Sequence, residues 1–391
     1  MTHSFQIHRR ALLGGVTAGI GLAYAGRAGA QPRAGRNKLV MVVARGAMDG
    51  LSVTIPYQDP DYAALRGGLA ISPPGQEDGA LALSDGFGLH PALATLHGLH
   101  GDGQLRFAPA VAIPARIRSH FDAQDVLENG GGRLREQSDG WLNRALAATG
   151  GNGLSIGAQT PLILRGATPI SSWAPGGNVR GGDRIASLLQ DLYVDHPMLG
   201  DSLARGLETE ALAAMSDDGA PVRRNDAAGL GQAVGRLMTG EAGADLVALS
   251  MDGWDTHARQ RPQIQSRLTG LDQLIGGLRT GLGEEWARTI VVVTTEFGRT
   301  VRVNGTQGTD HGTASSLLLL GGALKNGAPI GDWPTLAENR LFEGRDLAPT
   351  LDVRSVFKGV LRDHIGVDRA LLDTQVFPDS AREAPGVNGL T

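Results

Sequence analysis

Five short apolar runs, rich in β-branched side chains, predict buried strands along this chain. They cover residues 38–44, 105–113, 245–251, 289–295 and 315–320. Between them, apolar side chains recur at helical spacing over 91–99, 140–148, 258–281 and 351–365. Alternating strands and helices predict an α/β fold, with a mostly parallel central sheet covered by helices on both faces.

The stretch 165–240 has a different pattern. Glycine and proline punctuate its first part, and helical periodicity follows over 185–207 and 226–237, with no convincing strand. We therefore expect a helical insertion within one α/β domain of residues 36–375. Residues 376–391 are expected to form a C-terminal tail.

The first 30 residues have the pattern of an export signal. Arg9 and Arg10 precede a weakly apolar stretch rich in Gly and Ala, and Ala28-Gly29-Ala30 suits a cleavage site. This pattern predicts a twin-arginine signal peptide at 1–30, which leaves a periplasmic or secreted protein without a stable transmembrane anchor. The alternative is a chance arginine pair before an ordinary secretory signal. Because the twin-arginine route carries folded proteins, it would suit a metal acquired in the cytoplasm.

Composition narrows the function classes. Hydrophobic residues make up 41% of the chain and charged residues 19%, as in a globular protein. The net charge is −4, it falls to about −7 without the three arginines of the signal, and there is no basic tract. We therefore expect no nucleic-acid partner. Absence of cysteine excludes disulfides, thiolate metal sites and a cysteine nucleophile.

Polar clusters follow several predicted strands, where ligands bind in open α/β sheets. Carboxylates and imidazoles are the ligands that divalent metal ions take from proteins, and these clusters supply both. The candidate metal ligands are Asp49, Asp255, His257, Glu296, Asp310 and His311.

Each of these residues also has a structural explanation. Asp49 in an Asp-Gly pair is typical of a turn, and Asp255 could cap a helix that begins at residue 258. His311, beside glycine, could be a loop residue satisfied by the backbone. Their common position at one predicted sheet edge favours a site.

At these residues the chain resembles the exported bacterial proteins grouped as domain of unknown function 1501. The resemblance covers about residues 36–365. Its motifs are Arg45 to Leu51, Ser119 to Asp125, Gly253 to His257, Thr295 to Thr300, Gly308 to Gly312, Gly331 to Pro334 and Arg345 to Leu347.

That family is similar to the alkaline phosphatase and sulfatase superfamily, which implies a metal site for phosphate or sulfate ester chemistry. By this resemblance Asp49, the Asp255/His257 pair and His311 match metal ligands. Glu296 stands where the superfamily usually has an Asp-His pair, and Phe297 replaces the histidine. The spacing of the 255/257 pair is shorter than usual, although Asp252 could substitute.

Three residues are candidates for catalysis. Ser119 precedes a helix expected near residue 122 and is the best-placed nucleophile, and its neighbour His120 is a ligand, a base or neither. Arg299 could clamp developing negative charge, although a buried ion pair with Asp310 or Glu296 explains it equally well. The cofactor would be a divalent metal ion: zinc, manganese, calcium or magnesium.

These observations predict an exported metal-dependent hydrolase of phosphate or sulfate esters, acting on a small-molecule or polymer substrate. The alternative is a non-catalytic exported protein whose degenerate metal site binds a partner protein or polysaccharide. A dinucleotide-dependent oxidoreductase is disfavoured, because no GxGxxG motif follows the first strand.

Overall fold

The five apolar runs lie in one eight-stranded sheet of a computed structural model, which describes residues 35–175, 200, 203–207, 209 and 226–391. Strand β10 is antiparallel to both of its neighbours, and the other pairs of neighbours are parallel. The predicted mostly parallel sheet is therefore confirmed. Its order is β11 (Leu351–Asp352), β5 (Leu105–Ala112), β10 (Ser315–Leu320), β9 (Thr289–Thr294), β1 (Lys38–Arg45), β8 (Leu246–Asp252), β6 (Gly153–Ile156) and β7 (Ser171–Trp173).

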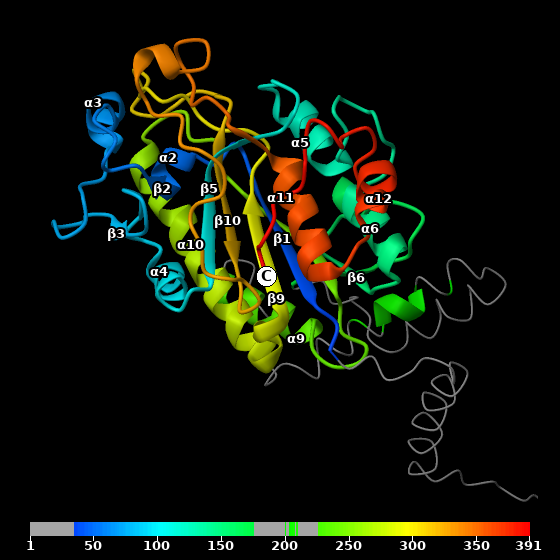
Figure 1. The fold of residues 1–391 in the computed structure, drawn as a ribbon. Coiled ribbons are helices and arrows are strands. Elements are labelled where there is room, and N and C mark those ends of the chain that lie inside the picture. The colour runs from blue at the N-terminus through cyan, green and yellow to red at the C-terminus, as the bar shows by residue number, and fades with distance from the viewer. Residues whose placement is uncertain (1–34, 176–199, 201–202, 208, 210–225) are drawn as a thin grey trace, which may run out of the picture. The chain divides into compact units, whose positions relative to one another are not determined.

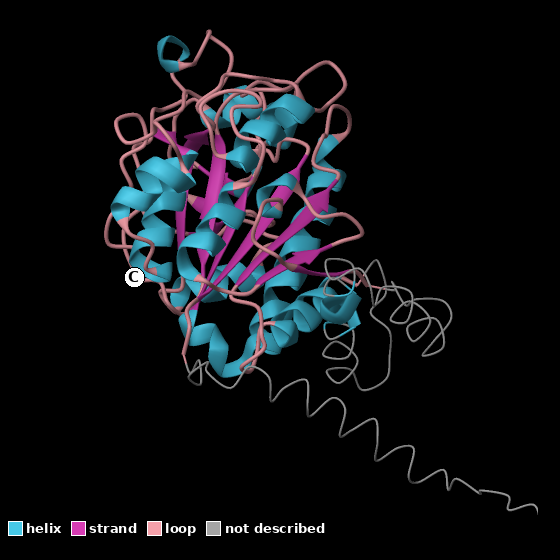
Figure 2. Ribbon diagram, turned by 90° about the vertical axis from the view of Figure 1, so that its right-hand side faces the viewer, coloured by secondary structure: helices cyan, strands magenta, loops and turns pink. Residues whose placement is uncertain are grey.

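Helices cover both faces of this sheet (Figures 1 and 2). Alternate side chains of β1 point to opposite faces: Met41 joins one buried cluster with Trp141 and Phe357, and Val42 joins the other with Leu271. One face packs against α5 (His120–Asn129), α6 (Trp141–Thr149) and α11 (Val353–Val360), and the other against α4 (Ala94–Gly101), α9 (Ala227–Leu237) and α10 (Gln260–Leu282). Burial on both faces explains why the strands read as continuous apolar runs.

A smaller layer lies beside the end of β1. It comprises α2 (Gly50–Val53), α3 (Tyr62–Arg66) and a three-stranded sheet of β2 (Thr54–Ile55), β4 (Gly88–Leu89) and β3 (Leu81–Ala82). Leu51, Ile55 and Tyr62 belong to a third apolar cluster, which holds this layer in place. Strands of two residues carry no readable period, so the sequence did not indicate them.

Two boundaries differ from the prediction. The stretch 165–240 contributes strand β7 to the sheet edge, so the expectation of no strand there was wrong. Residues 376–391 do not trail as a tail, because Phe377, Ala384 and Leu390 are buried and Trp141 lies against Phe377. Residues Asn37–Thr391 form one compact unit. The predicted signal at 1–30 and most of the predicted helix at 185–207 lie outside the described residues.

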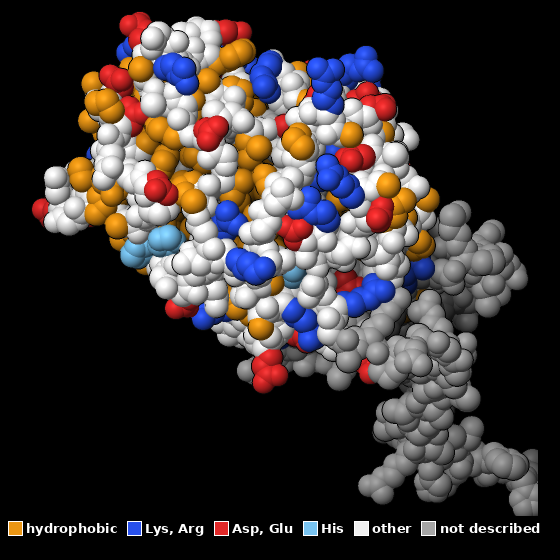
Figure 3. Space-filling model, in the orientation of Figure 1, with side chains coloured by type: hydrophobic (Ala, Val, Ile, Leu, Met, Phe, Trp, Pro, Cys, Tyr) orange, Lys and Arg blue, Asp and Glu red, His pale blue; other side chains and the backbone are white. Residues whose placement is uncertain are grey.

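Two further features concern the surface. None of the described helices has the length and apolar character needed to cross a membrane. On the face shown in Figure 3, basic side chains are scattered among acidic and apolar ones.

Candidate metal centre

Segments far apart in the sequence meet at the carboxyl edge of the parallel strands. Asp255 and His257 follow β8, Glu296 follows β9, and His120 begins α5 after β5. His311 precedes β10, and because β10 runs antiparallel to β9 it starts at the same edge. The predicted position of the polar clusters at one sheet edge is therefore what the fold produces.

Two glycines allow these loops to approach closely. Gly46 has φ +112°, and a Cβ there would lie 2.6 Å from the backbone nitrogen of Asp255. A Cβ on Gly298 would lie 1.7 Å from the carbonyl oxygen of Ala314. No other residue fits either position without moving the backbone, so glycine is required for the loops that carry the site.

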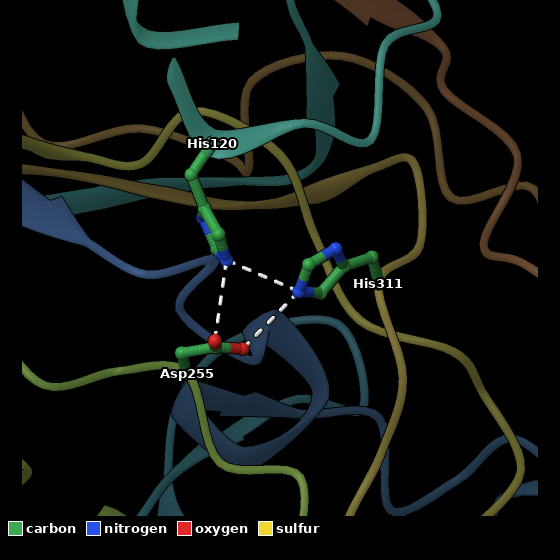
Figure 4. Close-up of side chains that lie close together, drawn as sticks. All are labelled: His120, Asp255 and His311. Carbon is green, nitrogen blue, oxygen red and sulfur yellow. Dashed lines mark hydrogen bonds and ion pairs between the residues drawn. The ribbon is translucent and has the colours of Figure 1, made fainter. Parts of the chain in front are cut away.

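Three imidazoles and one carboxylate converge in this space (Figure 4 shows His120, Asp255 and His311). Nε2 of His311 lies 3.1 Å from Nε2 of His120 and 3.0 Å from Nε2 of His257. Oδ1 of Asp255 lies 2.9 Å from Nε2 of His257 and 3.2 Å from Nε2 of His311. Its Oδ2 lies 3.4 Å from Nε2 of His120. We call these four residues the ligand cluster.

The outer ring nitrogens decide which atom of each imidazole carries the proton. Nδ1 of His311 lies 2.8 Å from the backbone carbonyl of Arg118, which can only accept, so this nitrogen donates. Nδ1 of His120 lies 2.7 Å from Oε1 of Glu296, and Nδ1 of His257 lies 3.2 Å from Oδ1 of Asp310. With the proton on Nδ1, each ring turns an Nε2 lone pair toward the cluster.

Glu296 brings a buried negative charge to the cluster. Its side chain is fully buried, and its Oε1 accepts from His120, from the backbone N–H of Gly46 and from Gln124, at 2.7, 2.8 and 3.2 Å. Burial opposes ionisation, but these hydrogen bonds hold the pKa of Glu296 below its usual value. The hydrogen bond between His120 and Glu296 outweighs burial and raises the pKa of His120.

Asp255 is oriented by a buried guanidinium. Arg299 donates from Nη1 to Oδ1 of Asp255 at 2.7 Å, while its Nε and Nη2 donate to the hydroxyl and carbonyl of Thr309. Burial raises the pKa of Asp255, but the hydrogen bond from Arg299 and the positive charge of its guanidinium outweigh burial and leave that pKa lowered. The carboxylate is thus ionised and fixed in orientation.

This donor set fits a divalent metal ion. Three Nε2 atoms and a carboxylate face one another, and such an arrangement is repulsive unless positive charge, from a proton or a metal ion, lies among them. The raised pKa of His120 reflects the same attraction for positive charge. Glu296 adds a buried charge that, within the described part of the chain, accepts no hydrogen bond from an arginine or lysine, and a buried charge needs compensation. The structure therefore contains a possible metal site of His and Asp ligands.

A family model described as "Protein of unknown function (DUF1501)" matches residues 36–376. The chain belongs to this family. The match covers most of the chain and confirms the resemblance that the sequence motifs indicated. No curated protein matches the sequence.

Several solved structures are similar to this DUF1501 protein at low identity. The C-terminal periplasmic domain of EcEptC from Escherichia coli, in complex with Zn, is 10% identical over 88% of this chain and 86% of that one, with a TM-score of 0.40. A protein of the alkaline phosphatase superfamily from Vibrio parahaemolyticus is 10% identical over 76% and 62%, with a TM-score of 0.36. Phosphonoacetate hydrolase from Sinorhizobium meliloti is 14% identical over 68% and 57%, with a TM-score of 0.32. Likenesses at this level assign no activity.

Three predicted ligands do not join the ligand cluster of the DUF1501 protein. Glu296 and Asp310 lie behind His120 and His257, at their Nδ1 atoms, and Asp49 lies apart from the cluster. The carboxylate of Asp49 is buried and forms an ion pair with Arg66 of α3, whose side chain is also fully buried. Ser52 and Gln260 donate to the same oxygen, Oδ2, at 2.7 and 2.5 Å. The guanidinium compensates the charge of Asp49, so this carboxylate needs no metal ion.

Other predicted residues take different places from those expected. Arg259, not Asp255, occupies the position before α10, so the helix-cap explanation for Asp255 was wrong. Arg299 pairs with Asp255 rather than with Asp310 or Glu296, and its side chain is fully buried, so none of its N–H groups is accessible to solvent. Ser119 is exposed immediately before α5 and makes no capping hydrogen bond through its side chain.

The sequence left His120 open as a ligand, a base or neither, and in the structure its ring points into the ligand cluster. The sequence indicated no role for Gln124, Gln260 or Thr309. In the structure Gln124 donates to Glu296. The hydroxyl of Thr309 donates to Gln260 at 2.6 Å and accepts from Nε of Arg299. The signal was present, since all three lie in or beside the family motifs. Neutral polar side chains have many uses, however, and only their contacts reveal this one.

Proposed function

We propose that this protein is an exported zinc-dependent hydrolase of phosphate or sulfate esters. The observation that carries the proposal is the convergence of three Nε2 lone pairs and one carboxylate, 2.9–3.4 Å apart in the contacts that define the cluster. Ligand atoms around a tetrahedral zinc ion lie roughly 3.3 Å apart. Imidazole-rich sets favour zinc over calcium and magnesium, which take oxygen ligands.

In this proposal His120, His257, His311 and Asp255 hold the ion. When bound, it supplies a Lewis acid for an ester oxygen and lowers the pKa of water. Glu296, Asp310 and the carbonyl of Arg118 accept the Nδ1 protons and so keep the Nε2 lone pairs directed inward. Ser119, beside His120, remains the proposed nucleophile, with water as the competitor for that role.

Solvent access supports a catalytic site over the non-catalytic alternative. The side chains of His120 and His311 are 23% and 25% exposed, and those of Asp255 and His257 are 42% and 44% exposed. Structural zinc sites are closed, whereas catalytic sites admit water or substrate. Because four protein ligands fill a tetrahedral set, an ester oxygen would enter here as a fifth ligand or in place of one of the half-exposed side chains. An ester could therefore reach this cluster.

The test combines metal content with turnover. We expect about one zinc ion per chain in protein matured in its own host, and cleavage of aryl phosphate or aryl sulfate esters. Asp255→Ala combined with His257→Ala should abolish both, whereas His97→Ala, a histidine on α4 outside the cluster, should change neither. A metal-free native protein, or full turnover in the double variant, would contradict the proposal. Ser119→Ala separates the nucleophiles, because attack by water survives it.

Export by the twin-arginine route is part of the same proposal. Replacing Arg9 and Arg10 with lysine should leave the precursor in the cytoplasm. Cell fractionation checks this result, and normal export of the variant would instead indicate an ordinary secretory signal.

A further inference from the structure

Two arginines lie beside the ligand cluster and share one buried carboxylate. Nη2 of Arg118 lies 2.7 Å from Oδ2 of Asp346, and Arg345 donates to Oδ1 from Nε at 2.9 Å and to Oδ2 from Nη2 at 3.3 Å. Asp346 is fully buried, and Thr313 also donates to its Oδ2. Because both guanidinium groups contact the same oxygen, their Nη2 atoms lie at most about 6 Å apart. We call Arg118 and Arg345 the arginine pair.

The arginine pair is attached directly to His311. The backbone carbonyl of Arg118 accepts a hydrogen bond from Nδ1 of His311. Nη2 of Arg345 donates to the backbone carbonyl of His311 at 2.8 Å. Arg118 also lies two residues before His120. The pair therefore flanks two of the four residues of the cluster.

Both arginines keep unused donors that face solvent. Their side chains are 32% and 43% exposed, and among the described residues neither Nη1 has a hydrogen-bond partner. A guanidinium Nη1 carries two N–H groups. The pair thus offers four N–H donors beside a site that is open to solvent.

The charges around the pair are incompletely balanced by buried groups. Asp346 compensates only one of the two cations. The other positive charge is balanced by Glu343, whose side chain is 56% exposed and whose carboxylate lies 2.7 Å from Nη2 of Arg118. An exposed carboxylate on an arginine contributes little stability and is easily displaced. Glu343 thus occupies the place that another anion would take.

We propose that the arginine pair is an oxyanion subsite that binds the phosphate or sulfate group of the substrate in place of Glu343. Planar guanidinium groups match the oxygens of tetrahedral oxyanions and bind them with paired N–H donors. The inference rests on the proposed function, because it names the groups that recognise the ester. It assigns a role to the Arg345-Asp346-Leu347 motif that the ligand cluster does not use.

The test measures binding of orthophosphate and of sulfate to the zinc-loaded protein by calorimetry at fixed ionic strength. Arg345→Ala should weaken binding about tenfold, Arg345→Lys less, and Glu343→Gln should tighten it several-fold. Arg302→Ala is the matched control, since Arg302 is an exposed arginine near an exposed carboxylate, Glu338, and it should change nothing. Arg118→Ala should also weaken anion binding, but it leaves the buried charge of Asp346 with one arginine partner instead of two. Arg345→Lys and Glu343→Gln provide the test if that variant does not fold.

Zinc affinity, measured by competition with a chelator, separates binding from a structural role. If the arginines only held the loop of His311, Arg345→Ala would weaken zinc binding and leave the affinity of the zinc-loaded protein for anions unchanged. That result, or unchanged anion affinity in both Arg345→Ala and Glu343→Gln, would overturn the inference. Preference for orthophosphate or for sulfate would support it and identify the ester class. Arginine-dependent anion binding without any ester turnover would support the subsite and contradict the hydrolase proposal instead.

Discussion

Glu296→Gln is the sharpest perturbation of the candidate metal centre. The amide keeps the shape of the side chain, and its oxygen can still accept from His120, Gly46 and Gln124. The new NH₂ group would replace Oε2, which lies 2.9 Å from the hydroxyl oxygen of Thr295, an atom that can accept. The substitution therefore removes one negative charge and little else.

The size of the effect follows from the geometry. Oε1 of Glu296 is separated from the cluster by one imidazole ring, so the carboxylate lies roughly 6.5 Å from a cation held there. At an effective dielectric constant of about 40, for a cluster partly open to water, a unit charge attracts a divalent ion by about 2.5 kcal/mol. Loss of this attraction corresponds to a decrease of roughly 50- to 100-fold in zinc affinity. Comparable losses are typical when a carboxylate behind a metal-binding histidine is removed.

A chelator competition titration at pH 7 would measure this change, with urea unfolding of the metal-free protein alongside. The metal-free variant should be no more stable than the wild type, because the lowered pKa of Glu296 means that the folded state favours the charged form of this side chain. Glu128→Gln is the matched control: Glu128 is also a buried carboxylate, but it pairs with Arg45, so zinc affinity should not change. Unchanged zinc affinity in Glu296→Gln would refute the assignment of this charge to the metal centre.

Three further predictions concern stability. Burial lowers the pKa of His90 from 6.5 to about 4, so between these pH values the unfolded chain binds a proton that the folded chain does not bind. The unfolding free energy should therefore fall by about 3 kcal/mol as the pH decreases from 6.5 to 4. In urea titrations, the unfolding free energy of His90→Asn should depend less on pH. Arg66→Ala leaves the buried carboxylate of Asp49 unpaired and should destabilise the protein by about 3–5 kcal/mol, while calorimetry finds the zinc affinity of the folded protein unchanged; a large loss of affinity would instead place Asp49 in the metal centre. Gly298→Ala should lower both thermal stability and zinc affinity, because its methyl group would collide with the carbonyl of Ala314; normal values for both would show that the loop can adapt.

The sheet was predictable where the pattern of side chains was long enough. Residues 289–295 and 315–320 read as buried strands, and they are β9 and β10 in the structure. The short strands β6 and β7 were missed, because three or four residues carry too little periodicity to separate a strand from a loop. The direction of β10 was not readable either, since orientation depends on how the chain crosses the sheet.

The candidate site was predictable in its chemistry and less so in its membership. Asp255, His257 and His311 were expected to meet because all follow or precede strands at one edge. Asp49 fulfilled the same criteria, yet its carboxylate forms an ion pair with Arg66 of α3. Local sequence cannot rank these outcomes, because a carboxylate near a strand end serves an arginine as readily as a metal ion.

By itself, the sequence determined the α/β class, the edge at which polar groups gather and the kinds of ligand available there, because these follow from local periodicity and residue type. Only the tertiary structure decided which atoms meet. His120 and His311 are 191 residues apart, yet their Nε2 atoms lie 3.1 Å from each other. Contacts on that scale depend on the packing of several loops against one another, and a shift of an ångström in any loop changes which lone pairs face which. The proton positions follow from the same packing, since each Nδ1 is directed by a partner that another loop supplies.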